Sequence, residues 1–311
     1  MPSIHIPVML AEVVRFLNCR PGRIYIDGTL GGAGHARAIC DHIIPDGVFI
    51  GIDQDKDAIR SAKRSLKPCR ATQYLVHENF VNLPVIMARY HIAAADGIFL
   101  DLGLSLDQLK SSGRGFSFST DEPLDMRMNT DTGLKAADIV NSESEAALNN
   151  IFRNFGEERW SKRIARKIVQ KRKKERIRSS QQLVNIIGTA IPQKAFAQKI
   201  HPATRVFMAL RIAVNRELEN LESILKSALD ILNPGGRICV LSFHSLEDRI
   251  VKTHMKAWQK GCTCPSDFPQ CVCGQKPRGR ILTKKVVRPT QGEIEINPMA
   301  RSTKLRAAEK L

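Results

Sequence analysis

A glycine-rich turn between two acidic residues is the part of the sequence best suited to bind a nucleotide-like cofactor. Asp27 ends a short apolar run, residues 28–34 follow it, and Asp53 comes 19 residues after Gly34. Glycines let the backbone turn sharply and approach a ligand, and the helix after such a turn directs free N–H groups at that ligand. The spacing of Asp53 is typical of a carboxylate that accepts hydrogen bonds from both ribose hydroxyls.

Two cofactors fit this arrangement, a dinucleotide and S-adenosylmethionine. A dinucleotide site has the pattern G-x-G-x-x-G, and after Gly32 and Gly34 this chain has Arg37 where the third glycine is needed. S-adenosylmethionine has no pyrophosphate and carries an ammonium group, for which Asp27 is a suitable partner. The pattern therefore favours S-adenosylmethionine. A nicotinamide oxidoreductase and a purely structural glycine turn are the alternatives.

Asp101 and Phe80 are two further candidates for the same site. Asp101 directly follows an apolar run, and the carboxyl ends of strands line the ligand crevice in open α/β sheets. An acid at this position is expected in a site, because it would be costly unpaired in a core. Phe80 follows another apolar run and is expected either to stack on an adenine or to fill the core.

Four cysteines lie close together in two C-x-C pairs, Cys262 with Cys264 and Cys271 with Cys273. Four thiolates suit a tetrahedral, structural zinc ion. Zinc sites more often have the spacing C-x-x-C, so free thiols or occasional disulfides in an exposed loop are the alternative. The chain has eight cysteines and no secretion signal, which indicates that the protein is located in a reducing cytoplasm.

Strand-like and helix-like segments alternate over the first hundred residues. Apolar strands that alternate with helices imply βαβ units and a parallel sheet, whose carboxyl edge would gather the candidate residues. Strands are expected at 23–27, 48–53, 73–76 and 97–102, with helices at 35–44 and 57–66.

The alternation stops between about residues 105 and 200, where the pattern is mostly helical. The alternating pattern then returns, with one helix at 206–232 ended by Asn-Pro-Gly-Gly, a strand at 237–243 and an edge strand at 284–287. We therefore expect an α/β fold with two domains. Residues 1–105 and 206–311 form the first, and residues 106–205 form an inserted helical domain.

Positive charge is concentrated in two segments. The chain has 48 Lys and Arg against 31 Asp and Glu, a net charge of +17. Residues 158–178 hold eleven basic and two acidic side chains, and residues 276–311 hold ten and three. Segregated charge of this kind favours a polyanionic partner. No long apolar run and no signal peptide are present, so we expect a cytoplasmic protein without a membrane partner.

The motifs together resemble the RsmH/MraW family of bacterial small-subunit ribosomal RNA cytosine-N4 methyltransferases. The resemblance covers nearly the whole chain, and the motifs occur in order. They are HIPVML (5–10), DGTLGGAGH (27–35), DLG (101–103), RGFSF (114–118), PLDMRM (123–128), FGEER (155–159), HPATR (201–205), SFHSLEDR (242–249) and NP (297–298).

This resemblance implies a class I S-adenosylmethionine-dependent methyltransferase, a Rossmann-like sheet with an inserted helical domain. It implies one cytidine of 16S ribosomal RNA, near the decoding P site of the small subunit, as the substrate. It also implies that S-adenosylmethionine is contacted by Ala33, Gly34, His35, Asp53, Phe80, Asp101 and Gln108.

The implied reaction needs a proton acceptor near N4 of cytosine, because the lone pair of that amine is delocalised into the ring. Asp101 is the candidate for this catalytic role. The family usually has a second serine after the position of Ser105, and this chain has Leu106 there. The alternative function is a non-catalytic ribosome-assembly factor that binds RNA and holds the cofactor only as a ligand. The sequence leaves the oligomeric state open.

Two groups of residues are candidates for contact with RNA. The basic stretch at 159–178 is expected to neutralise phosphates, with a solvated helix face as the alternative. Phe116 and Phe118 lie in a Gly- and Ser-rich loop, where they either stack on a splayed base or anchor the loop. The C-terminal cations are a second candidate phosphate contact: Lys276, Arg278, Arg280, Lys284, Lys285 and Arg288.

Overall fold

A computed structural model describes residues 6–131, 133–192, 201–262, 264, 269–270 and 272–311. The chain forms two compact units. The sheet unit consists of Met1–Gly103 and Leu218–Leu311, and the helical unit consists of Leu104–Glu217. The second boundary falls after Glu217 and not at the expected 205/206, because the buried side chains of helix α10 (Pro202–Asn215) belong to the core of the helical unit.

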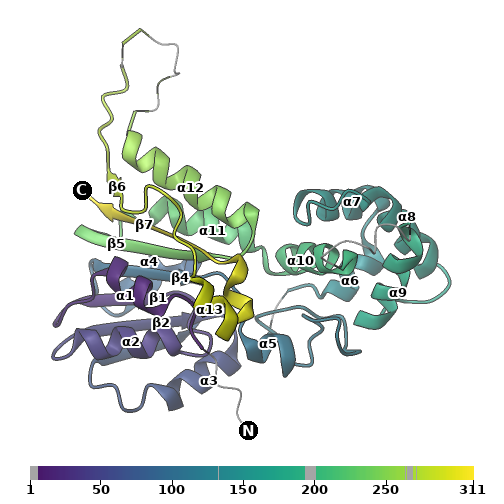
Figure 1. The fold of residues 1–311 in the computed structure, drawn as a ribbon, viewed down its shortest axis with the longest axis horizontal. Helices are drawn as coiled ribbons and strands as arrows, with labels where there is room; N and C mark the ends of the chain where they lie inside the picture. The colour runs from purple at the N-terminus through teal and green to yellow at the C-terminus, as the bar shows by residue number, and fades with distance from the viewer. Residues whose placement is uncertain (1–5, 132, 193–200, 263, 265–268, 271) are drawn as a thin grey trace. The chain divides into compact units, whose positions relative to one another are not determined.

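The sheet unit is built on seven strands. In chain order they are β1 (Ile24–Asp27), β2 (Val48–Asp53), β3 (Thr72–His77), β4 (Ala95–Asp101), β5 (Leu232–Ser242), β6 (Gly279–Ile281) and β7 (Lys304–Lys310). Their order in space is β3-β2-β1-β4-β5-β7-β6 (Figure 1). Strands β1 to β5 are parallel, and β7 is antiparallel to both neighbours. This is the topology of the class I S-adenosylmethionine-dependent methyltransferases, and the predicted fold class is confirmed.

Helices cover both faces of the sheet, as Figure 1 shows. One face packs against α1 (Leu10–Leu17), α2 (Gly34–Ile43) and α3 (Lys56–Ser65). The other face packs against α4 (Leu83–Arg89), α11 (Glu217–Ser227) and α12 (Ser245–Lys260). Because both faces are buried, β2 and β4 read as continuous apolar runs and were predictable from the sequence.

Three predictions for the chain after residue 205 are wrong. The single helix predicted at 206–232 is two helices, α10 and α11, because the backbone turns at Arg216, whose φ is 50°. The Asn-Pro-Gly-Gly segment lies within β5 and does not end a helix. The strand predicted at 284–287 is reduced to an isolated bridge between Val287 and Leu305, and the edge of the sheet is formed instead by β7 and β6.

The helical unit has a hydrophobic core of its own. Phe152, Ile164, Ile168 and Leu183 are fully buried in it. An inserted segment that buries its own core can fold as a separate body. Its helices are α5 (Leu106–Lys110), α6 (Ala136–Ser142), α7 (Glu145–Asn154), α8 (Ser161–Arg172), α9 (Ser180–Ala190) and α10.

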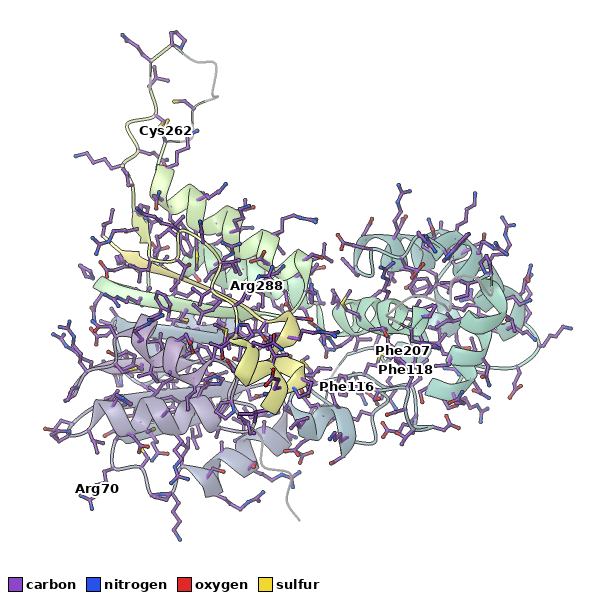
Figure 2. All side chains as sticks on the ribbon, viewed as in Figure 1. Arg70, Phe116, Phe118, Phe207, Cys262 and Arg288 are labelled. Carbon is purple, nitrogen blue, oxygen red and sulfur yellow. The ribbon has the colours of Figure 1, made fainter. Side chains whose placement is uncertain are left out.

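The two phenylalanines of the Gly- and Ser-rich loop anchor that loop to the helical unit. Phe116 is only 6% exposed and belongs to the core, with the Arg114 guanidinium above its ring. The ring of Phe118 lies 5.2 Å from that of Phe207 and 5.2 Å from that of His201 (Figure 2). In this conformation the two phenylalanines therefore anchor the loop. The Phe116 ring is not available to stack on a base.

Every helix in the part of the chain that the structure describes is too short or too polar to cross a lipid bilayer.

Candidate cofactor site

Three carboxylates meet at one edge of the sheet. Asp27, Asp53 and Asp101 are the last residues of β1, β2 and β4, and β1 lies between the other two strands. Because these strands are parallel, their carboxyl ends lie on the same edge. The structure thus brings together the three acids that the sequence analysis singled out.

The glycine-rich turn is fixed by hydrogen bonds to the strands on both sides of β1. Gly28 N–H donates to the Phe99 carbonyl of β4 at 2.9 Å, and Leu30 N–H donates to the Ile52 carbonyl of β2 at 3.0 Å. Gly31 and Ala33 have φ values of 46° and 62°, so the backbone turns through left-handed conformations before α2 begins. No side chain caps this helix, which leaves its first N–H groups for a ligand.

The Asp53 carboxylate accepts two backbone N–H groups and has acceptor capacity left over. Gly31 N–H donates to Oδ2 and Asp55 N–H donates to Oδ1, both at 2.8 Å. A carboxylate has about four lone-pair sites, so two hydroxyl groups of a ligand can still be bound. Burial raises the pKa of Asp53 to about 6, and the two N–H donors limit the rise.

Thr29 connects the ends of β1 and β4. Its Oγ1 accepts the N–H of Asp101 and lies 3.4 Å from Oδ1 of Asp27, which also accepts the Thr29 N–H at 3.0 Å. Asp27 is 1% exposed, and burial together with the neighbouring carboxylates raises its pKa to about 8. Thr29 was not among the predicted site residues, although an Asp-x-Thr turn after a strand is a recognisable signal of its contact with Asp27.

His35 ties the N-terminal segment to this edge of the sheet. Its Nε2 lies 2.8 Å from the carbonyl oxygen of Val8. A carbonyl can only accept, so Nε2 carries the proton and Nδ1 faces Asp101 Oδ2 at 3.6 Å. Burial lowers the pKa of His35 to about 4, so the ring is neutral near pH 7.

Gly34 is required by a close approach and not by its φ value. A Cβ atom built on Gly34 would lie 3.0–3.2 Å from the ring carbons of Pro7. Those contacts are tighter than ordinary van der Waals packing, so a side chain here would push the N-terminal segment away. Gly34, His35 and Pro7 therefore form one packed corner beside the turn.

Phe80 and Gln108 are placed differently from the three acids. Phe80 is 8% exposed and belongs to the sheet-unit core, directly below Gly28. Gln108 lies in the helical unit, where its Oε1 accepts the Ser105 N–H at 3.1 Å in the capping box of α5. Leu106 is the first residue of that helix. Contact of Phe80 and Gln108 with a cofactor stays a prediction.

Comparison with known proteins assigns the chain to a family. The MraW methylase family model matches residues 2–311. The chain belongs to the MraW methylase family. The predicted resemblance is thereby confirmed, and it covers the sheet unit and the helical unit alike.

Two relatives are similar to this chain over their whole length. A protein of Desulforapulum autotrophicum called "Ribosomal RNA small subunit methyltransferase H" is 55% identical, with 98% of each chain covered. A protein of the same name from Geobacter sulfurreducens is 52% identical, with 100% of each chain covered. The crystal structure of an rRNA methylase from Streptococcus thermophilus overlaps with 11% identity and a TM-score of 0.40, covering 100% of this chain and 99% of that one.

Three of the four clustered cysteines come together in the segment that follows helix α12, where Figure 2 labels Cys262. The Sγ atoms of Cys262, Cys264 and Cys273 all lie within 4.8 Å of one another, and those of Cys262 and Cys273 are 3.7 Å apart. All three are half-buried. Cys271, the fourth predicted ligand, lies outside the described residues.

The basic segment of the helical unit divides into paired and available cations. Arg166 pairs with Glu145 and Arg176 pairs with Asp138, and Arg172 donates to a backbone carbonyl. Arg159 and Arg163 lie over the ring of Trp160. The lysines of the segment, of which all but the half-buried Lys167 are exposed, make no ion pair with any residue that the structure describes: Lys162, Lys167, Lys171, Lys173 and Lys174.

The C-terminal cations are partly occupied as well. Arg278 pairs with Asp230, and Arg280 pairs with Glu309 of β7 at 2.6 Å. These two arginines hold β6 and its surroundings in place, which reduces the number of charges that this segment can offer to a polyanion.

Proposed function

We propose that this chain transfers a methyl group from S-adenosylmethionine to N4 of one cytidine in 16S ribosomal RNA, near the decoding P site of the small ribosomal subunit. The observation that carries this proposal is the meeting of Asp27, Asp53 and Asp101 around the glycine-rich turn, in a chain that matches a methylase family over its length. The names of the relatives support the small-subunit RNA as the substrate. That substrate makes the cytoplasm the expected location.

We assign the cofactor contacts by the chemistry of each residue. Asp53 binds the two ribose hydroxyls with its remaining lone pairs, and Asp27 binds the ammonium group of the methionine part. Ala33, Gly34 and His35 border the cofactor where α2 begins, and Phe80 and Gln108 are two further cofactor contacts proposed from the family resemblance. The high pKa of Asp27 fits this role, because an approaching cation favours the charged form of the carboxyl and lowers that pKa.

Asp101 is the proposed proton acceptor. The bound cofactor supplies a methyl group on a sulfonium, and the N–C bond forms as the S–C bond breaks. Asp101 accepts a hydrogen bond from the amine, takes up the proton that N4 releases and passes it to water. The backbone N–H of Asp101 is held by Thr29, which fixes the end of β4 while the carboxylate acts.

The cysteine cluster is proposed to hold a structural zinc ion. Two zinc–sulfur bonds of about 2.3 Å at the tetrahedral angle separate the sulfurs by about 3.8 Å. The distance of 3.7 Å between Cys262 and Cys273 supports this geometry, with Cys264 and Cys271 as the other ligands. The ion would close the extension that follows α12 and would take no part in methyl transfer.

Methyl transfer to isolated ribosomal subunits tests the proposed function. The purified protein is incubated with methyl-labelled S-adenosylmethionine and small subunits from a strain that lacks this enzyme, and the RNA is digested and analysed by mass spectrometry. We expect about one N4-methylcytidine per subunit, and none with Asp101→Asn in the same time. A protein that binds the subunit and the cofactor but transfers no label would be the assembly factor instead.

A further inference from the structure

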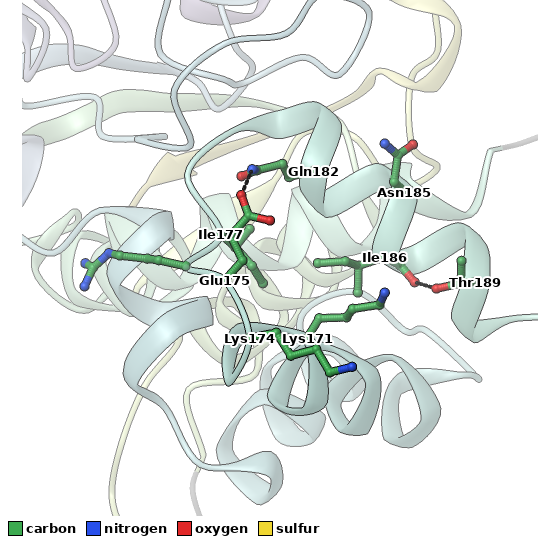
Figure 3. A pocket seen from close by; sticks show the side chains of 9 residues that line it. Lys171, Lys174, Glu175, Ile177, Gln182, Asn185, Ile186 and Thr189 are labelled. Carbon is green, nitrogen blue, oxygen red and sulfur yellow. Dashed lines mark hydrogen bonds between the residues drawn. The ribbon is translucent and has the colours of Figure 1, made fainter.

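The helical unit contains a pocket that none of the proposed cofactor residues line. It lies between the end of α8, the turn that follows it and one side of α9, and its volume is about 360 Å³ (Figure 3). Pockets that hold small ligands have volumes of roughly 300–1,000 Å³. A single nucleotide-sized group is therefore the scale of ligand that this pocket admits.

The floor of the pocket is apolar and one side of it is cationic. Ile177 and Ile186 are 2% and 8% exposed and form the apolar surface. Lys171 and Lys174 lie at the exposed rim, and neither ammonium group has a carboxylate partner among the described residues. The one acid that lines the pocket, Glu175, accepts a hydrogen bond from Gln182 Nε2 at 3.1 Å on the side away from the lysines (Figure 3).

Two neutral polar residues, Asn185 and Thr189, also line the pocket and differ in hydrogen-bonding capacity. Asn185 Oδ1 accepts from Gln181 at 3.3 Å, which leaves its amide N–H groups to donate. Thr189 Oγ1 donates to the Ile186 carbonyl at 2.9 Å, which leaves its lone pairs to accept. A ligand that offers both an acceptor and a donor, as the edge of a nucleobase does, can use this pair.

We propose that this pocket binds one unpaired nucleotide of the RNA substrate, other than the methylated cytidine. The base lies on Ile177 and Ile186 with its edge at Asn185 and Thr189, and its phosphate lies between Lys171 and Lys174. The nucleotide has to be unpaired, because a base that is paired and stacked offers neither its face nor its Watson–Crick edge. The proposal rests on the proposed function, since it takes RNA as the polyanion.

A pocket and a merely charged surface make different predictions. A charged surface attracts phosphates without regard to base pairing, and its contribution depends only on how many cations it carries. A pocket that holds an unpaired nucleotide binds single-stranded RNA in preference to double-stranded RNA, and its affinity depends on uncharged residues. The double variant Asn185→Ala/Thr189→Val tests this, because both side chains are exposed and the net charge is unchanged.

The experiment measures binding by fluorescence anisotropy, with a short single-stranded RNA of mixed sequence and with the duplex that it forms with its complement. We expect Asn185→Ala/Thr189→Val to weaken single-strand binding about tenfold and to leave duplex binding unchanged. Lys174→Gln is expected to weaken single-strand binding more than Lys173→Gln. Lys173 is the matched control, because it is the exposed neighbour with the same charge and does not line the pocket. Thermal melting checks that each variant is folded.

Two results would contradict the proposal that this pocket binds a nucleotide. One is wild-type affinity of Asn185→Ala/Thr189→Val for the single strand, and the other is an equal loss for Lys173→Gln and Lys174→Gln, which a charged surface predicts. The methyl-transfer assay separates this from the proposed function. If methyl transfer is normal and either of those binding results is found, only the proposal of a nucleotide-binding pocket is rejected. If methyl transfer is absent and RNA binding follows the expected pattern, only the proposed function is rejected.

Discussion

Asp53 uses part of its hydrogen-bonding capacity on the protein itself and leaves the rest for a ligand. The N–H groups of Gly31 and Asp55 fix both oxygens in place before any ligand arrives. A preorganised acceptor loses little freedom on binding, which is the advantage of building it into the backbone of the turn. The same hydrogen bonds mean that the carboxylate holds the turn against β2.

Asp53→Asn should weaken cofactor binding about 10- to 100-fold, because hydrogen bonds to a charged acceptor are replaced by bonds to a neutral amide. Titration calorimetry with S-adenosylhomocysteine measures the change. Asp57→Asn is the control, since Asp57 is an exposed acid near the start of α3 that pairs with Arg60. An unchanged dissociation constant for Asp53→Asn would remove Asp53 from the site.

Asp27 makes the stability of the ligand-free protein depend on pH. Its pKa is about 8 in the folded chain, whereas an exposed aspartate of the unfolded chain has a pKa of 3.8. Between these values the unfolded chain has lost the proton and the folded chain keeps it, so the free energy of unfolding falls as the pH rises from about 4 to about 8. His35 acts in the opposite direction below about 6.5, because its pKa is lowered.

Asp27→Asn should reduce this pH dependence by about 1 kcal/mol per pH unit, because the amide does not titrate. Urea unfolding at several pH values between about 5 and about 8 measures it for both proteins. The difference between the two curves cancels the contribution of His35. Parallel curves would mean that Asp27 is ionised in the folded protein at neutral pH.

At the scale of elements, the corner where α2 begins depends on the contact between Gly34 and Pro7. Gly34→Ala should lower the free energy of unfolding by about 1–3 kcal/mol, because the added Cβ overlaps the Pro7 ring. Gly292→Ala is the matched control in α13 (Gln291–Ile296), where a Cβ meets nothing within 4 Å. That substitution should leave stability unchanged or raise it by up to about 1 kcal/mol. Thermal unfolding distinguishes the two.

The extension after α12 should carry one zinc ion per chain. Metal analysis of protein purified without added metal measures the content, and Cys262→Ser/Cys273→Ser should abolish it. Cys69→Ser is the control, because Cys69 is also a half-buried free thiol but lies outside the cluster. Wild-type protein without near-stoichiometric zinc would leave the cluster as free thiols.

The elements that the sequence predicted are those whose signal is local. Strands β2 and β4 are apolar throughout because both faces are covered, and each ends in an acid at the carboxyl edge. Strand β7 escaped prediction because Lys304, Arg306, Glu309 and Lys310 interrupt its apolar pattern, and it is ordered by pairing with β5 and β6. The contact of Thr29 with Asp101 joins residues 72 positions apart, which no local pattern reveals.

At the scale of the whole molecule, the cofactor acids and the largest basic segment lie in different units. The three acids belong to the sheet unit, and residues 158–178 belong to the helical unit. Cofactor binding and RNA binding should therefore respond to separate substitutions. Charge reversal disturbs the fewest internal contacts at the lysines of α8 and of the turn after it, because these lysines make no ion pair with a described residue.

Lys171→Glu/Lys174→Glu should weaken RNA binding strongly and leave the dissociation constant for S-adenosylhomocysteine unchanged. The plot of log affinity against log salt concentration should become shallower by about 1.4 for single-stranded RNA, at about 0.7 for each phosphate contact. Anisotropy at several salt concentrations measures the slope. RNA affinity equal to that of the wild type at all salt concentrations would contradict the prediction.

The insertion of the helical unit within the sheet unit also affects how the chain folds during translation. Strand β4 ends at Asp101, and its partner β5 begins at Leu232, so the whole helical unit is synthesised between them. At about 5–20 residues per second, the open side of β4 waits on the order of ten seconds for its neighbour. During translation this apolar edge is exposed to other nascent chains, and chaperone protection matters most at that stage.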